Sequence, residues 1–306
     1  MLSTTKFAAL RGVRSQILVP LLRTARVRRN YSSTADVETR GSHSVTPSEL
    51  EKFVKVSDSW WDPQGPFKYL HTMNRTRTQF IRSHLADLSR LPRQETLGRA
   101  WIRGRRVVDI GCGGGLASES LARLGMQVLG VDAARENVEM ARIHAQRDPA
   151  LARNLEYVQT TAEQLVAAQD GRHAFDVVVS LEVIEHVADP VAFVRSLVDL
   201  AAPGASLFIS TMNRTPVSLL VDVIVPEYVL GTVPRGTHDH SKFIAPEELA
   251  EMLRSCGAET LETRGLVLNP LTNTCHLVPQ DLGLLRNLGV QANYIIAARK
   301  PKTKSK

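Results

Sequence analysis

The sequence predicts an α/β protein with a doubly wound, mostly parallel sheet and helices on both faces. From residue 105 onward, short apolar runs alternate with stretches of helical periodicity, which is typical of βαβ units. The first apolar run ends in a cluster of glycines, and the second ends in an acid. In open α/β sheets, ligands bind beyond the carboxyl ends of the strands, so both features predict a binding site at that edge.

Seven strands are expected from the apolar runs of the chain. The first five are Arg106–Ile110, Gln127–Val131, Leu155–Val158, Phe175–Ser180 and Ser206–Ser210. Helical patterns lie between them at Leu116–Leu124, Arg135–Arg147 and Pro190–Leu200. Two later runs, Glu259–Val267 and Asn293–Arg299, complete the sheet. An apolar stretch followed by a polar turn interrupts this rhythm at 213–246, which we interpret as an insertion after the fifth strand.

The N-terminal segment differs in composition from the rest of the chain. The formal net charge is +7, but residues 1–35 contain no acid and seven basic residues, and the remainder carries 31 basic and 31 acidic residues. An Arg-rich, acid-free segment with Ser and Thr is typical of a mitochondrial transit peptide, which we predict over residues 1–31. A disordered basic tail that binds acidic surfaces is the alternative. The neutral remainder argues against a nucleic-acid-binding surface.

The loop after the first strand is a candidate ligand site. Its segment Asp109–Gly115 runs from a buried strand into a glycine cluster that precedes a helix. Glycine permits positive φ and close approach of a ligand to the backbone, and the helix start offers free N–H groups. The dinucleotide fingerprint fails because Leu116 stands where its third glycine belongs, and no P-loop lysine follows. We expect Gly111 and Gly113 to contact a cofactor.

The acid at the end of the second strand is Asp132, which follows Gly111 by 21 residues. An acid at this place can accept hydrogen bonds from both hydroxyls of a ribose. Taken alone, Asp132 could equally cap the helix that follows. A ribose acid beside a loop without a pyrophosphate fingerprint indicates a nucleoside ligand that lacks phosphates. S-adenosylmethionine is the commonest such ligand.

Three side chains with metal-binding chemistry follow the fourth strand. If a helix begins here, Glu182, Glu185 and His186 lie on one face of it. Two carboxylates and an imidazole can hold a divalent ion. In the alternative, the site has no metal, His186 contacts the substrate, and a glutamate caps the helix. The residues alone leave both interpretations open.

Longer segments resemble known enzymes. Asp109–Gly115 resembles motif I of class I methyltransferases. The wider text resembles the ubiquinone biosynthesis O-methyltransferase family over about residues 50–299, in the segments Trp60–Pro63, Gly65–Lys68, Leu70-His71, Ser180–Val187, Glu227–Leu230, Val233–Asp239, Asn269–Thr272 and Asn293-Tyr294. Two segments depart from the family pattern. Asn-Pro-x-Arg is replaced by Asn74–Arg77, and Asp-Val-Asn-Tyr is replaced by Gln291–Tyr294.

This resemblance implies a class I S-adenosylmethionine-dependent methyltransferase fold. It implies cofactor contacts at Arg77, Gly111, Asp132 and Leu181, and a magnesium-type site at Glu182, Glu185 and His186. A bound cation would lower the pKa of a phenolic hydroxyl and orient the phenolate for attack on the sulfonium methyl. His186 acting as a general base without metal is the alternative.

The same resemblance implies methylation of a polyprenyl dihydroxybenzoate and of a demethylubiquinol. The expected partners are this polyprenylated aromatic substrate and a ubiquinone-biosynthesis multi-enzyme complex, with no nucleic acid. The expected location is the matrix face of the mitochondrial inner membrane, by peripheral contact. The apolar stretch Val217–Val233 is too short and interrupted for a membrane span. It suits either a segment lying at the membrane surface or a lid over the active site.

We therefore divide the chain into a transit peptide (1–31), a linker (32–47), an N-terminal helical cap (48–100), a methyltransferase domain (101–300) with its insertion (213–246), and a basic tail (301–306). Two other functions stay open. One is a matrix methyltransferase that acts on RNA or protein. The other is a methyltransferase fold without activity that serves as an assembly factor, although the intact glycine loop and Asp132 argue against it.

Overall fold

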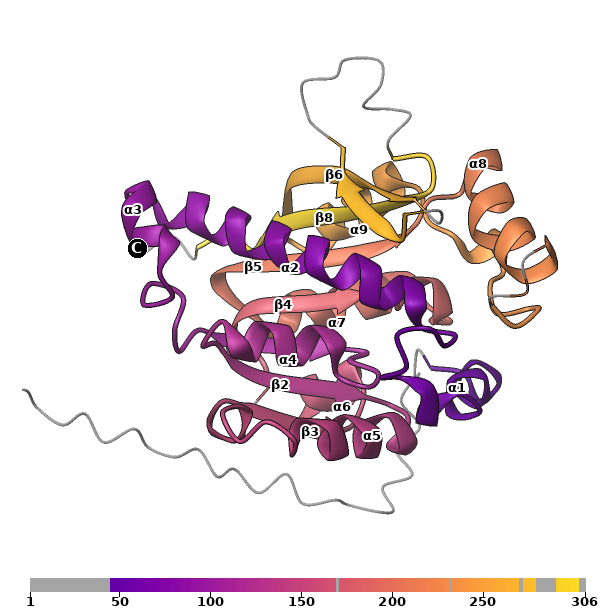
Figure 1. Cartoon of the computed structure of the whole chain (residues 1–306). Coiled ribbons are helices and arrows are strands. Elements are labelled where there is room, and N and C mark those ends of the chain that lie inside the picture. The colour runs from indigo at the N-terminus through magenta and orange to yellow at the C-terminus, as the bar shows by residue number, and fades with distance from the viewer. Residues whose placement is uncertain are drawn as a thin grey trace, which may run out of the picture. The chain divides into compact units, whose positions relative to one another are not determined.

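The computed structural model describes residues 45–168, 171–229, 231, 233–269, 272–278 and 290–302 (Figure 1). These residues belong to one compact unit of the chain. The predicted transit peptide, most of the predicted linker and the end of the basic tail lie outside the described residues.

A single mixed sheet forms the centre of this unit, as predicted. Its strands are β1 (Arg106–Ile110), β2 (Gln127–Asp132), β3 (Leu155–Gln159), β4 (Phe175–Leu181), β5 (Ala201–Met212), β6 (Glu259–Asn269), β7 (Thr274–Leu277) and β8 (Asn293–Arg299). They lie in the order β3-β2-β1-β4-β5-β8-β6-β7. Strands β1 to β5 pair in parallel, whereas β8 runs antiparallel to both β5 and β6. The carboxyl ends of the parallel strands therefore meet at one edge.

The prediction of seven strands was wrong, because the described part of the sheet has eight. The additional strand, β7, pairs antiparallel with the end of β6. Its four residues, Thr274–Leu277, are the shortest run in which alternation of polar and apolar residues can indicate a strand. The turn before it contains Asn273 with a φ of 50°, a left-handed conformation that asparagine adopts more readily than most residues.

Helices cover both faces of the sheet, as predicted. On one face lie α2 (Lys68–Ser89), α4 (Leu116–Arg123) and α5 (Arg135–Ala145), and on the other lie α6 (Ala162–Ala167), α7 (Pro190–Leu200) and α9 (Pro246–Ser255) (Figure 1). Local signals place the helix starts. For example, the Asp189 carboxylate accepts the Ala192 N–H at 2.9 Å, and Pro190 is the first residue of α7.

The remaining helical segments are short. Before α2 lie α1 (Pro47–Val54) and the 3-10 helix η1 (Ser57–Ser59), and α3 (Arg93–Leu97) follows α2. The 3-10 helices η2 (Leu151–Arg153) and η3 (Ile184–His186) follow α5 and β4. The predicted insertion contains α8 (Pro216–Ser218), the π-helix η4 (Leu219–Val229) and the 3-10 helix η5 (His240–Lys242). No helix among the described residues combines the length and apolar character that crossing a bilayer requires.

Phe208 of β5 lies at the centre of the core and is fully buried. Its ring meets Phe80 edge-on at 6.1 Å and His84 at 5.6 Å between ring centroids, so it links the sheet to α2. We expect Phe208→Ala to lower the free energy of unfolding by about 3–5 kcal/mol, because it removes a large buried side chain and leaves a cavity. Urea denaturation measures this loss.

Ile143→Ala is the matched control, because Ile143 is exposed on α5. It should change the free energy of unfolding by less than about 0.5 kcal/mol. Equal losses in the two variants would contradict the central place of Phe208 in the core.

Candidate active site

A cavity of about 880 Å³ opens at the carboxyl edge of the parallel strands. Its walls include the glycine loop after β1, the end of β2, the turn after β4, the N-terminal helices and the insertion. The predicted contacts Gly111, Gly113, Asp132 and Leu181 all line it. Glu182, Glu185 and His186 line it as well. The fold thus brings residues from distant parts of the sequence to one site.

The glycine loop is narrow because neighbouring side chains lie directly against its backbone. Gly111 has a φ of 74°, and a Cβ there would come within 2.4 Å of Val183. Gly113 has a φ of 53°, and a Cβ there would come within 2.3 Å of the Trp60 ring. Both positions therefore require glycine, for conformation and for space.

Two tryptophans hold the N-terminal helices on this loop. The Trp60 ring stacks on Phe67 with centroids 3.7 Å apart, and its Nε1 donates to Asn137 Oδ1 at 2.8 Å. The Trp61 Nε1 donates to the Gly114 carbonyl at 2.9 Å. The sequence signalled these tryptophans only through the family resemblance, because their contacts are distant along the chain.

Asp132 lies at the cavity wall and stabilises the glycine loop. Its Oδ2 accepts the Gly113 N–H at 2.9 Å, and its Oδ1 accepts the Ala134 N–H at 2.8 Å. The Asn137 amide also donates to Oδ1, at 3.2 Å. Burial raises the pKa of Asp132. The contact with Ala134 at the start of α5 corresponds to the helix-capping interpretation, and the position in the cavity allows the ribose contact as well.

Arg77 is not among the residues that line the cavity, but it contacts one of them. Its side chain is buried, and its guanidinium contacts Glu182 Oε1 at 3.2 Å and Ser210 Oγ at 3.5 Å. The Arg77 Nε has no hydrogen-bond partner among the described residues. The structure therefore brings this predicted cofactor contact to a carboxylate of the predicted metal site.

The two glutamates after β4 have different environments. Glu182 has a φ of 58°, which is rare for a residue with a side chain, and its Oε1 accepts the Ser210 hydroxyl at 2.6 Å. Glu185 Oε2 accepts the Thr211 hydroxyl at 2.8 Å, whereas Oε1 is buried without a partner among the residues described. Burial is the largest cause that raises the pKa of Glu185, to about 8, and the neighbouring charge of Glu182 is the second. A 3-10 turn, η3, follows Glu182 in place of the α-helix considered above.

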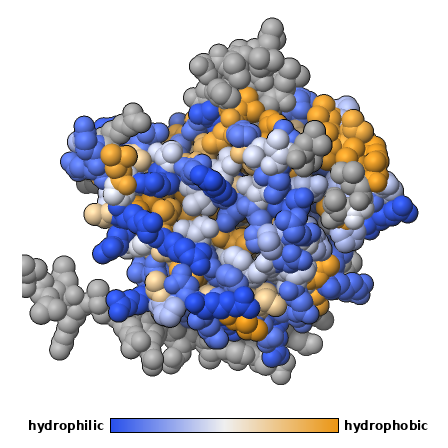
Figure 2. All heavy atoms as spheres, in the orientation of Figure 1, coloured by the Kyte–Doolittle hydropathy of each residue, from blue (hydrophilic) through white to orange (hydrophobic). Residues whose placement is uncertain are grey.

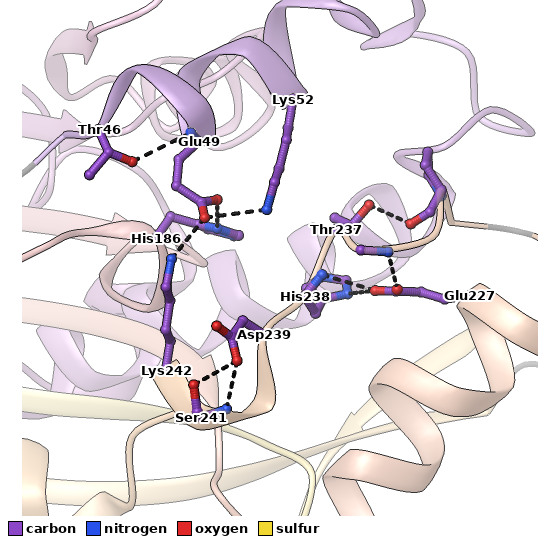
Figure 3. A network of polar contacts seen from close by, with 12 residues as sticks. Thr46, Glu49, Lys52, His186, Glu227, Thr237, His238, Asp239, Ser241 and Lys242 are labelled. Carbon is purple, nitrogen blue, oxygen red and sulfur yellow. Dashed lines mark hydrogen bonds and ion pairs between the residues drawn. The ribbon is translucent and has the colours of Figure 1, made fainter.

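His186 contacts a carboxylate that the sequence analysis missed. Its Nδ1 lies 3.1 Å from Glu49 Oε2, and Glu49 Oε1 accepts from Lys242 at 2.8 Å and from Lys52 at 3.3 Å (Figure 3). Hydrogen bonding from His186 is the largest cause that lowers the pKa of Glu49, and burial lowers the pKa of His186. Glu49 thereby links α1, the turn after β4 and the end of the insertion.

The metal prediction can be tested against these contacts. Within the described ranges, no group of three His, Cys, Asp or Glu side chains converges as metal ligands do. Glu182 is paired with Arg77, and His186 with Glu49. The two carboxylates nevertheless fit a hard cation, and Glu185 Oε1 is a buried acceptor that such an ion would satisfy.

In the insertion, the carboxylate of Glu227 stabilises the loop over the cavity. Glu227 of η4 accepts the Gly236 N–H at 2.6 Å, the His238 N–H at 2.9 Å, and the His238 ring at 3.0 Å (Figure 3). Burial alone would raise the pKa of Glu227, but these hydrogen bonds lower it overall. The insertion therefore forms a structured wall of the cavity.

Known proteins resemble this chain along most of its length. A family model of the methyltransferase domain matches residues 17–263. The ubiquinone biosynthesis O-methyltransferase of Dinoroseobacter shibae is 40% identical over 264 residues, which cover 86% of this chain and 99% of that protein. The chain belongs to the ubiquinone biosynthesis O-methyltransferase family. A mitochondrial member from Arabidopsis thaliana is 44% identical over 79% of this chain and 73% of its own length.

Membership of this family confirms the prediction that the chain is an S-adenosylmethionine-dependent methyltransferase. A solved structure confirms the fold. The S-adenosylmethionine-dependent methyltransferase of Thermotoga maritima, described as a possible histamine N-methyltransferase, superposes with a TM-score of 0.51 over 83% of this chain and 99% of that one, at 19% identity.

Asp132→Asn tests the cofactor side of the site. We expect the Kd for S-adenosylmethionine to rise roughly 10- to 100-fold, because a hydrogen bond to a charged acceptor is worth about 1.5–3 kcal/mol. Isothermal titration calorimetry measures the Kd. Asp87→Asn makes the same charge change on the exposed side of α2 and should leave it unaltered. An unchanged Kd in Asp132→Asn would refute the ribose contact.

Proposed function

We propose that this methyltransferase transfers the methyl group of S-adenosylmethionine to a catechol hydroxyl of a polyprenyl dihydroxybenzoate and of a demethylubiquinol. The observation that carries the proposal is the single cavity in which the glycine loop and Asp132 meet Glu182, Glu185 and His186. The family supports the substrate class, because its members are named for ubiquinone biosynthesis.

The geometry suits in-line transfer between two bound reactants. The glycine loop and Asp132 lie at the ends of β1 and β2, and the glutamates lie at the end of the adjacent β4. A cofactor on the first wall and a phenol on the second would face each other across the cavity. Holding reactants in such an arrangement supplies a large part of the acceleration of a two-substrate reaction.

Mg²⁺ would be held by Glu182, Glu185 and His186 in this proposal. The ion supplies a lowered hydroxyl pKa, which makes the phenol a better nucleophile near neutral pH. Arg77 contacts Glu182, and Glu49 contacts His186; partners of this kind orient metal ligands. In a site without metal, His186 is the candidate general base.

An assay with and without magnesium tests the function. We expect the purified full chain to transfer labelled methyl from S-adenosylmethionine to a short-tailed prenyl dihydroxybenzoate. Chelator and Glu185→Gln should each lower the rate by roughly 100-fold or more, because the hydroxyl then stays protonated. Glu51→Gln, an exposed change on α1, should be neutral.

The outcomes separate the two parts of this proposal. Full activity in chelator would retain methyl transfer and remove the metal, which leaves His186 as the base. No transfer by a wild-type chain that binds the cofactor would contradict the proposed substrate.

The surface of the insertion supports peripheral membrane contact. The α8–η4 segment exposes a group of large apolar side chains, namely Val217, Leu220, Val221, Ile224, Tyr228 and Val229. Figure 2 shows an apolar patch where Figure 1 places this segment, at the upper right. Substrates with polyprenyl tails reside in lipid, and the same segment lines the cavity on its inner side. One segment can therefore be both the membrane contact and the lid.

We infer a mitochondrial enzyme at the matrix face of the inner membrane, associated with other enzymes of ubiquinone biosynthesis. The mitochondrial relative from Arabidopsis thaliana supports the organelle. The division of the chain into a transit peptide (1–31), a linker (32–47), a helical cap (48–100), a methyltransferase domain (101–300) and a basic tail (301–306) is part of this proposal.

Charge introduced into the patch tests the membrane contact. Leu220→Asp combined with Ile224→Asp should abolish most flotation with liposomes that contain anionic lipid, because each change places an ion in the apolar layer. Ile143→Asp is the matched control, because Ile143 is an exposed apolar residue of α5 outside the patch. This variant should float like the wild type. Undiminished flotation of the double variant would refute the membrane role of the patch.

A further inference from the structure

The π-helix η4 presents one acid to the cavity. Asp222 lines the cavity wall together with Val221 and Val225, whereas its neighbours Leu220 and Ile224 are exposed and do not line the cavity. The sequence showed Asp222 only as an interruption of an apolar stretch. A long π-helix is rare, and π-helical turns occur often at functional sites.

The Asp222 carboxylate is only half satisfied. Its Oδ1 accepts the Asn293 amide of β8 at 3.0 Å. Its Oδ2 is buried and has no hydrogen-bond partner in the part of the chain that the structure describes. The titratable groups that act on it are His238 of the loop over the cavity and Glu182 after β4. Burial is the largest cause that raises the pKa of Asp222, to about 7.

A buried acceptor without a partner costs free energy, so an isolated one calls for an explanation. Asp222 lines the same cavity as Glu185. The Oε1 atom of Glu185 is likewise buried without a hydrogen-bond partner among the described residues. Because Asp222 lines this cavity, a donor that enters it and reaches Oδ2 would give this atom a partner. A catechol has two adjacent hydroxyl groups, and each of them can donate one hydrogen bond.

We propose that Asp222 is a substrate-binding residue whose Oδ2 accepts the hydrogen bond of one catechol hydroxyl, while Asn293 holds the carboxylate through Oδ1. This inference rests on the proposed function, since it assumes a catechol substrate. It assigns Asp222 a role in specificity, because a ring that lacks this hydroxyl would leave the carboxylate buried and unpaired. Sites built to bind a hydroxyl discriminate strongly against analogues without it.

A double-mutant cycle between protein and ligand tests the contact directly. The ligands are a short-tailed prenyl dihydroxybenzoate and the matching compound that lacks one of the two adjacent hydroxyls. Their Kd values are measured by calorimetry on the full chain with S-adenosylhomocysteine present, for the wild type, Asp222→Asn, Asp222→Ser and the control Asp87→Asn. Asp222→Asn keeps the shape of the side chain and can still accept from Asn293.

We expect Asp222→Asn to raise the Kd of the dihydroxy compound roughly 10- to 100-fold, the value of a hydrogen bond to a charged group. The Kd of the monohydroxy compound should change less than about threefold. In the wild type, the Kd of the dihydroxy compound should rise as the pH falls from 8 to 6, because protonation of Asp222 removes the charged acceptor. This pH dependence should be weaker in Asp222→Asn, where Glu185 remains as a carboxyl group of the cavity with a raised pKa.

Several results would overturn the proposal. One is an equal loss of affinity for both compounds, and another is an unchanged Kd for the dihydroxy compound. A loss of S-adenosylhomocysteine binding in both Asp222→Asn and Asp222→Ser would show a structural role instead. An increase confined to the magnesium concentration for half-maximal activity would assign Asp222 to the ion.

The binding cycle is independent of turnover, so it separates this inference from the proposed function. Hydroxyl-dependent binding without methyl transfer would support Asp222 and contradict the reaction. Methyl transfer by Asp222→Asn with wild-type kcat and KM would support the reaction and contradict the role of Asp222. A wild-type chain that binds neither compound would contradict both.

Discussion

The active site depends on the absence of side chains at Gly111 and Gly113. Val183 after β4 lies against the first of them and Trp60 of the N-terminal segment against the second, each where a Cβ would stand. Through these two contacts, the turn that carries Glu182 and Glu185 and the N-terminal helices both pack against the glycine loop. Asp132 completes the arrangement from β2, since it accepts the Gly113 N–H. The glycine loop thus positions the end of β2, the turn after β4 and the N-terminal helices around the cavity.

The features that the sequence predicted well are those that repeat locally. The apolar runs that became β1 to β6 and β8, the glycine loop and Asp132 all follow from composition, spacing and order along the chain. Strand β7 was not predicted, because its four residues are at the lower limit of a recognisable strand pattern. The helix considered after β4 became a 3-10 turn, because Glu182 leaves the strand in a left-handed conformation.

The contacts that organise the chemistry could not be predicted in this way. Glu49 and His186 are separated by 137 residues, and Arg77 and Glu182 by 105. Such pairs depend on which side chains the completed fold brings together. Asp222 was hidden for a different reason: in a run of apolar residues, its role depends on which side of η4 faces the cavity, and π-helical periodicity is not expected from sequence.

The conformation of Glu182 has a consequence for the evolution of this enzyme. A left-handed φ at a residue with a side chain costs the folded state about 1 kcal/mol or more, and glycine would remove that cost. Glycine would also remove the carboxylate that pairs with Arg77 and faces the cavity. Selection for thermal robustness alone would nevertheless retain Glu182, because glycine would leave the buried Arg77 guanidinium unpaired at a cost of about 3–5 kcal/mol, more than the strain it relieves. The unfavourable backbone conformation at position 182 therefore persists because the ion pair that it allows is worth more to the fold than the strain costs.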